Sequence, residues 1–267
     1  MPSIQPPVIL LHTSKTMRSP APGATLPCTP ALMHTAGVLA QYMKGLSSDQ
    51  LQTIMHISAA LADKTYETYA AWNDKAGQQS LAIDSFVGDI YSGLRATTLS
   101  AADRQYANDH LRILSGLYGI LRPFDGVRPY RLEMGYRLPG KPYANLYDFW
   151  GATIAETLPS SGLVINLAAV EYSRTITPYV EAARVVSPRF LTVDPKTGEP
   201  TFVVVHAKIA RGAYARWLIT SRANDRASLP MFSDIGYRYA PQLSTPAEPV
   251  FVCQEFGGKG LSMRLEK

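Results

Sequence analysis

The residues best suited to chemistry in this sequence lie in an arginine-rich segment, which reads LRILSGLYGILRPFDGVRPYRLEMG and spans Leu111–Gly135. Glycines and prolines separate its arginines, and the backbone must turn repeatedly because glycine accepts a positive φ and proline fixes φ. Guanidinium groups on such a backbone present rigid donor pairs that suit phosphate, sulfate or carboxylate oxygens. We therefore predict an anion-binding segment; the alternative is a surface loop whose arginines pair with nearby acids. The arginines are Arg112, Arg122, Arg128 and Arg131.

Five further polar clusters fall at bends or strand ends, the positions from which side chains converge on a cleft. Each cluster alone could be structural, since Asp89 could cap a turn and Glu133 could hold a loop arginine. We predict instead that the clusters meet, because all of them combine acids, tyrosines or cations. The clusters are Ser14-Lys15-Thr16, Asp89 with Tyr91, Tyr130-Arg131 with Glu133, Asn166 with Glu171-Tyr172, and Lys208 with Arg211 and Arg216.

Buried strands and amphipathic helices must position these clusters. Short apolar runs predict strands over Val8–His12, Leu163–Leu167, Arg184–Val193, Phe202–His206 and Val250–Gln254. Apolar periodicity and capping signals predict helices over Ala31–Lys44, Leu51–His56, Ser58–Trp72, Ala101–Leu114, Leu146–Leu158 and Lys208–Arg222. Helices and strands mix without regular βαβ alternation, so we predict an α+β fold in one domain over residues 1–267.

Composition narrows the function classes. The 267 residues are 46% hydrophobic, enough for a full core, and a net charge of +5 mildly favours anionic ligands. Two distant cysteines give no disulfide framework, so we expect a cytoplasmic protein. The apolar run near the N-terminus extends only from Val8 to Leu11, so we expect neither a signal peptide nor a membrane span. No phosphate-loop, dinucleotide-binding, nucleophile-elbow or zinc-protease motif is present, and the histidines lack ligand spacing. We therefore predict no cofactor and no metal.

Taken together, these clusters make the chain resemble the YaaA family of peroxide stress proteins, from Ser14 to about Tyr239. The resemblance implies an α+β domain with a basic cleft and a helix-hairpin-helix-like element for DNA. That element would be SGLYG after the helix ending near Leu114, with Gly116, Gly119, Arg112 and Arg122 as DNA contacts. The most specific stretches are FVGDIYSGL (Phe86–Leu94), Leu111–Gly135, LYDFWG (Leu146–Gly151), NLAAVEY (Asn166–Tyr172) and AKIARG (Ala207–Gly212).

The chain departs from the family pattern at several polar positions. Val87 stands where the family block F-K-G-D has lysine, and Ile209 stands where A-K-K-A-R-G has its second lysine. Ala169 stands where N-L-A-S has serine. Because affinity for DNA phosphates depends on the number of cations, these losses argue against DNA binding by this chain.

Two functions remain open, beside the alternative of a purely structural ion-pair network. The first is an enzyme for a small anionic substrate, because carboxylates repel DNA phosphates but serve as bases in a catalytic cleft. Divergent relatives resemble antibiotic-biosynthesis enzymes that close strained rings such as aziridines by intramolecular displacement of sulfate. The second is a DNA-binding stress protein that limits iron-driven oxidative damage.

Under the enzyme hypothesis, the protein holds the substrate by its anionic group, and a carrier protein could deliver the substrate. Glu171 or Asp89 would deprotonate the attacking amine, with Lys15 and Tyr172 as further catalytic residues. The cations would stabilise the departing anion. The expected anion- and substrate-binding residues are Arg131, Arg211, Lys208, Arg122, Tyr130, Glu133, Asn166 and Tyr91.

Overall fold

The computed structural model describes residues 7–18, 27–75, 79–140 and 143–260. Its centre is a five-stranded sheet in the order β6-β5-β1-β8-β9. All five residues of β1 (Val8–His12) are buried, as expected for an apolar strand covered on both faces. β5, β1, β8 and β9 pair in parallel, whereas β6 returns antiparallel at the edge. The other strands are β5 (Leu111–Ser115), β6 (Gly119–Leu121), β8 (Val164–Asn166) and β9 (Val185–Val186).

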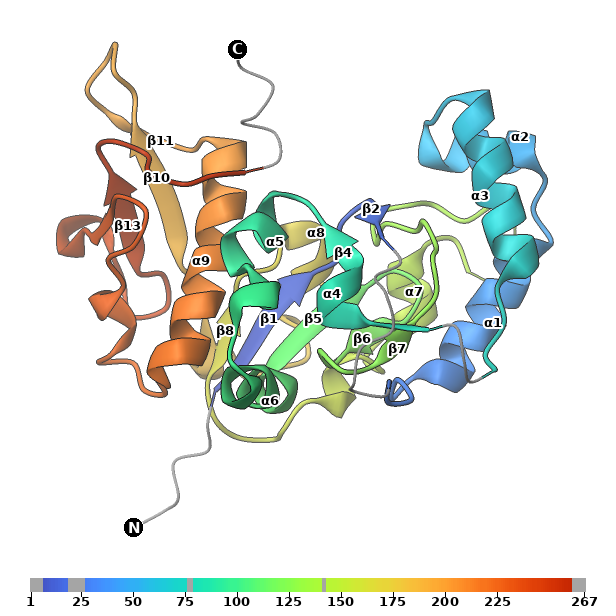
Figure 1. Ribbon diagram of the computed structural model, residues 1–267, viewed down its shortest axis with the longest axis horizontal. Coiled ribbons are helices and arrows are strands. Elements are labelled where there is room, and N and C mark those ends of the chain that lie inside the picture. The colour runs from blue at the N-terminus through green and yellow to red at the C-terminus, as the bar shows by residue number, and fades with distance from the viewer. Residues whose placement is uncertain (1–6, 19–26, 76–78, 141–142, 261–267) are drawn as a thin grey trace.

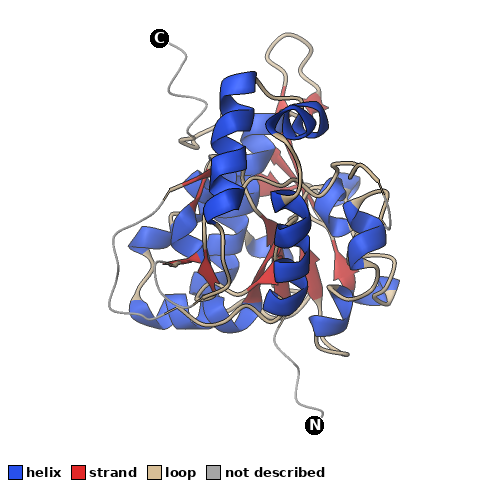
Figure 2. Cartoon of the chain, turned by 90° about the vertical axis from the view of Figure 1, so that its right-hand side faces the viewer, coloured by secondary structure: helices blue, strands red, loops and turns tan. Residues whose placement is uncertain are grey.

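Helices enclose this sheet on several sides (Figures 1 and 2). α1 (Met33–Lys44), α2 (Ser48–Met55) and α3 (Ala59–Ala71) lie at one side of it. At the opposite side, α9 (Val204–Ser221) lies between the central sheet and a second sheet of order β11-β10-β13-β12. The strands of that sheet are β10 (Arg189–Val193), β11 (Pro200–Thr201), β12 (Tyr237–Tyr239) and β13 (Val250–Cys253).

Shorter elements complete the chain between these parts. They are β2 (Thr16–Met17), β3 (Ser80–Leu81), α4 (Ala82–Ser85), β4 (Phe86–Val87), α5 (Asp89–Leu94), α6 (Ala101–His110), β7 (Gly126–Val127), α7 (Leu146–Trp150) and α8 (Val170–Ser173).

Two glycines let α5 and α9 pack backbone to backbone. A methyl group on Gly212 would lie 2.8 Å from the backbone nitrogen of Leu94 and closer still to the Ile90 carbonyl. A methyl group on Gly93 would lie 2.8 Å from the backbone nitrogen of Ala213. Only glycine permits so close an approach. The contact fixes α5 against the helix that carries Lys208 and Arg211.

Mixed helix and strand content agrees with the predicted α+β class, and several elements are confirmed. β1 and β8 lie where strands were predicted, and Ser47 and Gln50 form the predicted capping box. The strand predicted at Phe202–His206 is wrong, because Val204–His206 forms the first turn of α9. Its β-branched residues favour a strand locally, but packing along the whole helix decides.

Two other predicted elements are shorter than expected. The helix predicted over Leu146–Leu158 stops at Trp150, where Gly151 adopts a φ of 48°. The strand predicted over Arg184–Val193 divides into β9 and β10, which belong to different sheets.

The expected helix-hairpin-helix element is corrected by the structure. The preceding helix ends at His110 rather than Leu114, because Leu111–Ser115 pairs with the buried strand β1. SGLYG is therefore the turn between antiparallel strands β5 and β6. Gly116 and Gly119 are both buried, against the Leu132 carbonyl and the Trp150 ring respectively. These glycines face the protein interior, so they are not placed to hold a DNA phosphate.

Candidate functional site

Several of the predicted site residues lie at or just after the carboxyl ends of parallel strands. β1 ends at His12 and leads to Lys15, while β8 ends at Asn166 and leads to Glu171 on α8. In the sheet, His12 is paired with Leu114 and Leu10 with Asn166, so these ends share one edge. Open sheets with parallel strands bind ligands at this edge.

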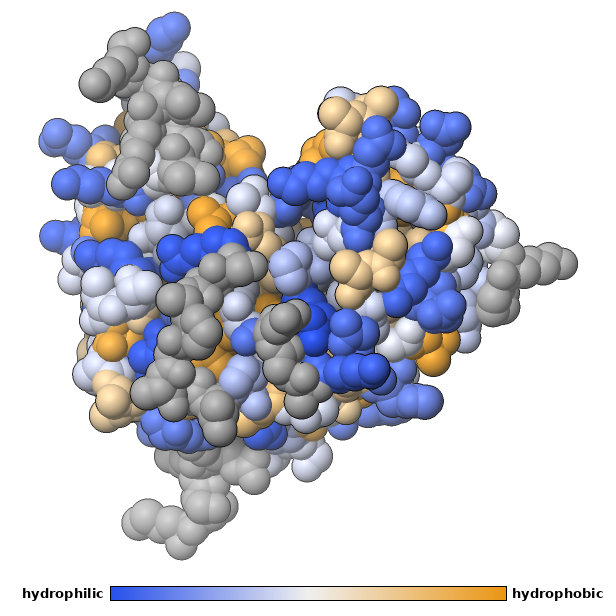
Figure 3. Space-filling model, turned by 45° about the vertical axis from the view of Figure 1, so that its right-hand side comes forward, coloured by the Kyte–Doolittle hydropathy of each residue, from blue (hydrophilic) through white to orange (hydrophobic). Residues whose placement is uncertain are grey.

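The surface is hollowed near this edge. The edge lies between the part that carries α2 and α3 and the part that carries the C-terminal sheet (Figure 1). The space-filling view shows a notch between these two parts, with hydrophilic side chains along its rim (Figure 3). A basic cleft at this place remains a prediction.

Four charged residues meet here, and we name Lys15, Arg131, Glu133 and Glu171 the acid–base cluster. Lys15 Nζ lies 2.9 Å from Glu133 Oε2. The same carboxylate oxygen accepts a hydrogen bond from the Tyr136 hydroxyl at 2.9 Å. Arg131 Nη1 donates to the backbone carbonyl of Lys15 at 3.5 Å. The cluster thus joins the loop after β1 to the arginine-rich segment.

Glu171 is held in this cluster by hydrogen bonds to both its side chain and its backbone. Its Oε1 accepts the backbone N–H of Gly135 at 2.7 Å, and the Tyr147 hydroxyl donates to its backbone carbonyl at 2.8 Å. Burial raises the pKa of Glu171 above its ordinary value, and the charge of Glu133 adds to this. The Gly135 N–H and Lys15 act in the opposite direction but do not cancel the effect. A carboxylate whose pKa is raised in this way is suited to general base catalysis.

Three buried tyrosines lie beneath the cluster. The Tyr91 hydroxyl donates to the backbone carbonyl of His12 at 3.0 Å. Thr13 is hydrogen-bonded to both Tyr130 and Tyr172. Burial raises the pKa of all three tyrosines well above the ordinary range, so they stay protonated at neutral pH. They can orient other groups or a substrate by hydrogen bonds but do not act as bases there.

His12 is held neutral at the end of β1. Its ring stacks on Tyr172 at a centroid distance of 4.8 Å, and Nδ1 accepts the backbone N–H of Ala169 at 3.2 Å. Burial, then the charges of Arg211 and Lys208, lower the pKa of His12 to about 3. Arg211 and Lys208 therefore lie within electrostatic reach of His12. Among the described residues, no carboxylate forms an ion pair with either cation.

A pH effect on stability follows from His12. Its folded pKa is lowered, so its contribution to stability is complete above about pH 6.5 and declines as pH falls toward 3. We expect this residue to lower the free energy of unfolding by about 2 kcal/mol between pH 6.5 and pH 5, measured by urea denaturation. A His12→Gln variant, which keeps an acceptor, should lose this pH dependence. An unchanged slope in the variant would contradict the assignment.

The remaining predicted site residues lie outside the acid–base cluster or use their polar atoms in hydrogen bonds that hold the backbone. Asn166 donates to Ser187 Oγ at 3.2 Å and accepts the Ala168 N–H at 3.1 Å, so it holds the turn after β8. Asp89 begins α5, and its Oδ1 lies 2.9 Å from where a methyl group on Gly260 would stand. Asp89 thus faces the chain after the second sheet.

The placement of Arg122 and Arg112 corrects the prediction that they belong to the site. They lie at the end of the sheet opposite to the carboxyl ends of β1 and β8. β6 runs antiparallel to β5, so Arg122 returns to the start of β5 beside Arg112. Burial, then the charge of Arg122, lower the pKa of Arg112 to about 10. Asp125 shares this group, and burial raises its pKa to about 6. These residues do not belong to the acid–base cluster.

Sequence reasoning missed four residues that contact the site: His12, Thr13, Tyr136 and Tyr147. His12 ends a predicted central strand and Thr13 directly follows it, the same signal that identified Lys15. Nothing in the sequence alone distinguishes Tyr136 and Tyr147 from packing tyrosines. Among the described residues, no group of histidine, cysteine, aspartate or glutamate side chains is arranged to hold a metal ion.

Comparisons with known proteins agree along the chain. The family model described as peroxide stress protein YaaA matches residues 8–243. A UPF0246 protein of Salinispora tropica is 62% identical over 259 residues, which cover 96% of this chain and 98% of the relative. A UPF0246 protein of Caulobacter vibrioides is 40% identical over 251 residues, 91% of this chain and 98% of the relative. In the described part of the chain, no helix has the length and apolar character needed to span a membrane.

Proposed function

This chain belongs to the YaaA family of peroxide stress proteins, and from that premise we propose that it is an enzyme for a small anionic substrate. The observation that supports this proposal is the acid–base cluster, in which Glu171 has a raised pKa beside the Lys15–Glu133 ion pair. A surface that only held polyanions would not benefit from two carboxylates at its centre. An enzyme uses both signs, one to accept a proton and the other to hold an anion.

The reaction class proposed is an intramolecular displacement that closes a strained ring. Glu171 accepts a proton from an amine of the substrate, and the nitrogen then forms a bond to the carbon that carries the leaving group. The carbon–oxygen bond breaks, and its electron pair leaves with sulfate or phosphate. Lys15 and Arg131 hold that anion, with Lys208 and Arg211 as further cations. The product is an aziridine, and the protein contributes mainly proximity and charge stabilisation.

The test uses simple amino esters as probes. 2-Aminoethyl hydrogen sulfate and 2-aminoethyl phosphate are incubated with the protein, and released inorganic sulfate or phosphate is measured together with the ring product by mass spectrometry. We expect release above the uncatalysed rate from an ester of this class, with ring product in equal amount. Release without ring product would show hydrolysis and contradict ring closure. No release from free or carrier-bound amino esters would contradict the enzyme proposal.

The second candidate is DNA binding in a peroxide-stress response, favoured by membership of the peroxide stress family and by Lys208 and Arg211, with which no carboxylate of the described residues forms an ion pair. It would use the notch, because the buried SGLYG turn and the distant Arg112 and Arg122 are not placed for it.

DNA binding is tested by fluorescence anisotropy with duplex and single-stranded oligonucleotides at several salt concentrations. If the enzyme proposal holds alone, we expect no binding near physiological salt. Binding whose logarithm falls with log salt at a slope of about −0.9 per contacted phosphate, and which weakens in a Lys208→Ala Arg211→Ala variant, would establish this second function.

A further inference from the structure

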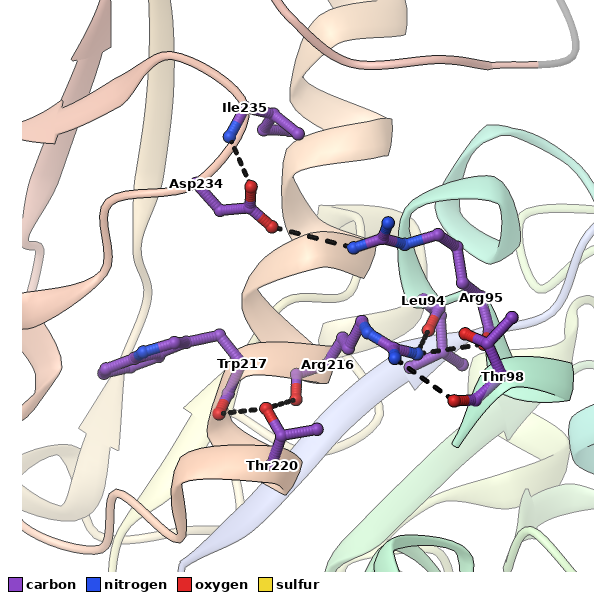
Figure 4. Close-up of polar contacts among 8 residues, drawn as sticks. All are labelled: Leu94, Arg95, Thr98, Arg216, Trp217, Thr220, Asp234 and Ile235. Atoms are coloured by element: carbon purple, nitrogen blue, oxygen red, sulfur yellow. Dashed lines mark hydrogen bonds and ion pairs between the residues drawn. The ribbon is translucent and has the colours of Figure 1, made fainter. Parts of the chain in front are cut away.

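A small pocket beside α9 combines two arginines with an aromatic wall. Its volume is about 220 Å³. In Figure 4, the guanidinium groups of Arg95, just after α5, and Arg216, on α9, extend into the same region. The lining residues are Arg95, Arg216, Trp217, Thr220, Ser233 and Asp234.

Arg216 is held in place by the backbone around the end of α5. Its Nη1 donates to the carbonyls of Leu94 at 3.2 Å and Arg95 at 3.0 Å, and its Nη2 donates to the carbonyl of Thr98 at 3.3 Å (Figure 4). A guanidinium has five N–H groups, so these three bonds fix its plane and leave donors for a ligand. Burial, then the charge of Arg95, lower the pKa of Arg216, which places two like charges close together.

Arg95 has only a loose partner. Its Nη2 lies 3.8 Å from Asp234 Oδ2, which is too long for a hydrogen bond, and the two side chains are 55% and 49% exposed. An exposed pair of this length contributes little. The pocket thus contains two guanidinium groups and a single carboxylate, which leaves an excess of positive charge.

The backbone is strained at two residues that border the pocket. Arg95 has a φ of 49° and Ile235, next to Asp234, has a φ of 46°. Glycine would adopt these values without strain, whereas a β-branched residue does so at a cost. Strain of this kind is concentrated at ligand clamps, because the fold must hold a particular side chain there.

We propose that this pocket binds the tetrahedral oxyanion of a phosphate or sulfate monoester, with the ester group packed against Trp217. Arg95 leaves Asp234 and pairs with the oxyanion beside Arg216, and the Ser233 hydroxyl adds a donor. The Thr220 hydroxyl already donates to carbonyls of α9, so it serves only as part of the wall. The site lies beyond the end of α5 opposite to Asp89, and it does not depend on the proposed function.

The test uses phenyl phosphate and phenyl sulfate at constant ionic strength, followed by tryptophan fluorescence and isothermal titration calorimetry. Trp72 and Trp150 are only 5% and 1% exposed, so Trp217 should report binding. We expect saturable binding of at least one ester. Comparison of the two esters shows whether the pocket binds a phosphate or a sulfate group. A response that does not saturate with either ester would overturn the proposal.

Two matched variants decide whether Arg95 is responsible. Arg95→Gly removes the guanidinium and relieves the positive φ, so it should weaken binding at least tenfold without lowering the thermal midpoint. Arg222→Gly also replaces an arginine at a positive φ (59°) outside the pocket, but it releases Asp103, whose charge acts on Arg216, so it should change binding less than Arg95→Gly does. Equal losses in both variants would show a general charge effect and overturn the proposal.

Asp234→Asn gives a further directional test. It removes the carboxylate that competes with the ligand for Arg95, so it should tighten binding at least threefold. Loss of binding in this variant would mean that Asp234 helps to hold the ligand instead of competing with it for Arg95, and the oxyanion assignment would be wrong.

Discussion

Replacement of Gly212 by alanine is expected to lower the free energy of unfolding by about 3 kcal/mol or more. The added methyl group would meet the Ile90 carbonyl and the Leu94 backbone nitrogen, the latter at 2.8 Å. Both are backbone atoms, so no side-chain rotation relieves the clash and α5 must move away from α9. α5 also carries Tyr91, and the variant should therefore disturb the floor of the site as well. Urea denaturation monitored by circular dichroism measures the change in stability.

Gly37 provides the matched control for Gly212. It lies within α1, and a methyl group there would have no atom within 4 Å. Gly37→Ala should raise stability by about 0.5–1 kcal/mol, because alanine restricts the unfolded chain and favours helix. If both variants change stability alike, helix propensity rather than the α5–α9 contact determines the result, and the packing argument fails.

Glu171→Gln is expected to reduce ester displacement by about 10²- to 10⁴-fold, the usual contribution of a general base. Glutamine keeps an oxygen that can accept the Gly135 N–H, but it cannot accept the substrate proton. The wild-type rate should fall as pH drops through the folded pKa of Glu171, which lies above its ordinary value. Release of sulfate from 2-aminoethyl hydrogen sulfate across a pH series gives this profile.

A measurement of stability distinguishes a catalytic defect from a folding defect in the Glu171→Gln variant. Because the folded pKa of Glu171 is raised, the folded state favours its protonated form, and ionisation at higher pH lowers the free energy of unfolding. Glu171→Gln should therefore be as stable as wild type at neutral pH, or more stable. Glu156→Gln, at an exposed residue outside the cluster, should keep full activity. Full activity in Glu171→Gln would exclude this residue as the base.

Patterns among neighbouring residues correctly predicted those elements that are stabilised mainly by contacts between neighbouring residues or by full burial. The capping box of Ser47 and Gln50 and the apolar run Val8–His12 each form as predicted, because hydrogen bonding between neighbours and full burial leave few alternatives. The same local reasoning failed at Phe202–His206 and Leu111–Leu114. There, packing of a whole helix and pairing with β1 outweigh the preference of a few residues.

The sequence by itself determined the family and the residue types of the candidate site, since Lys15 and Glu171 both follow recognisable strands. Only the tertiary structure decided which of these residues meet. Parallel pairing of β1 and β8 brings the segments that carry Lys15 and Glu171 to one end of the sheet, whereas the antiparallel return of β6 carries Arg122 to the other end. Strand direction and order depend on contacts between distant parts of the chain, and no local pattern of residues encodes them.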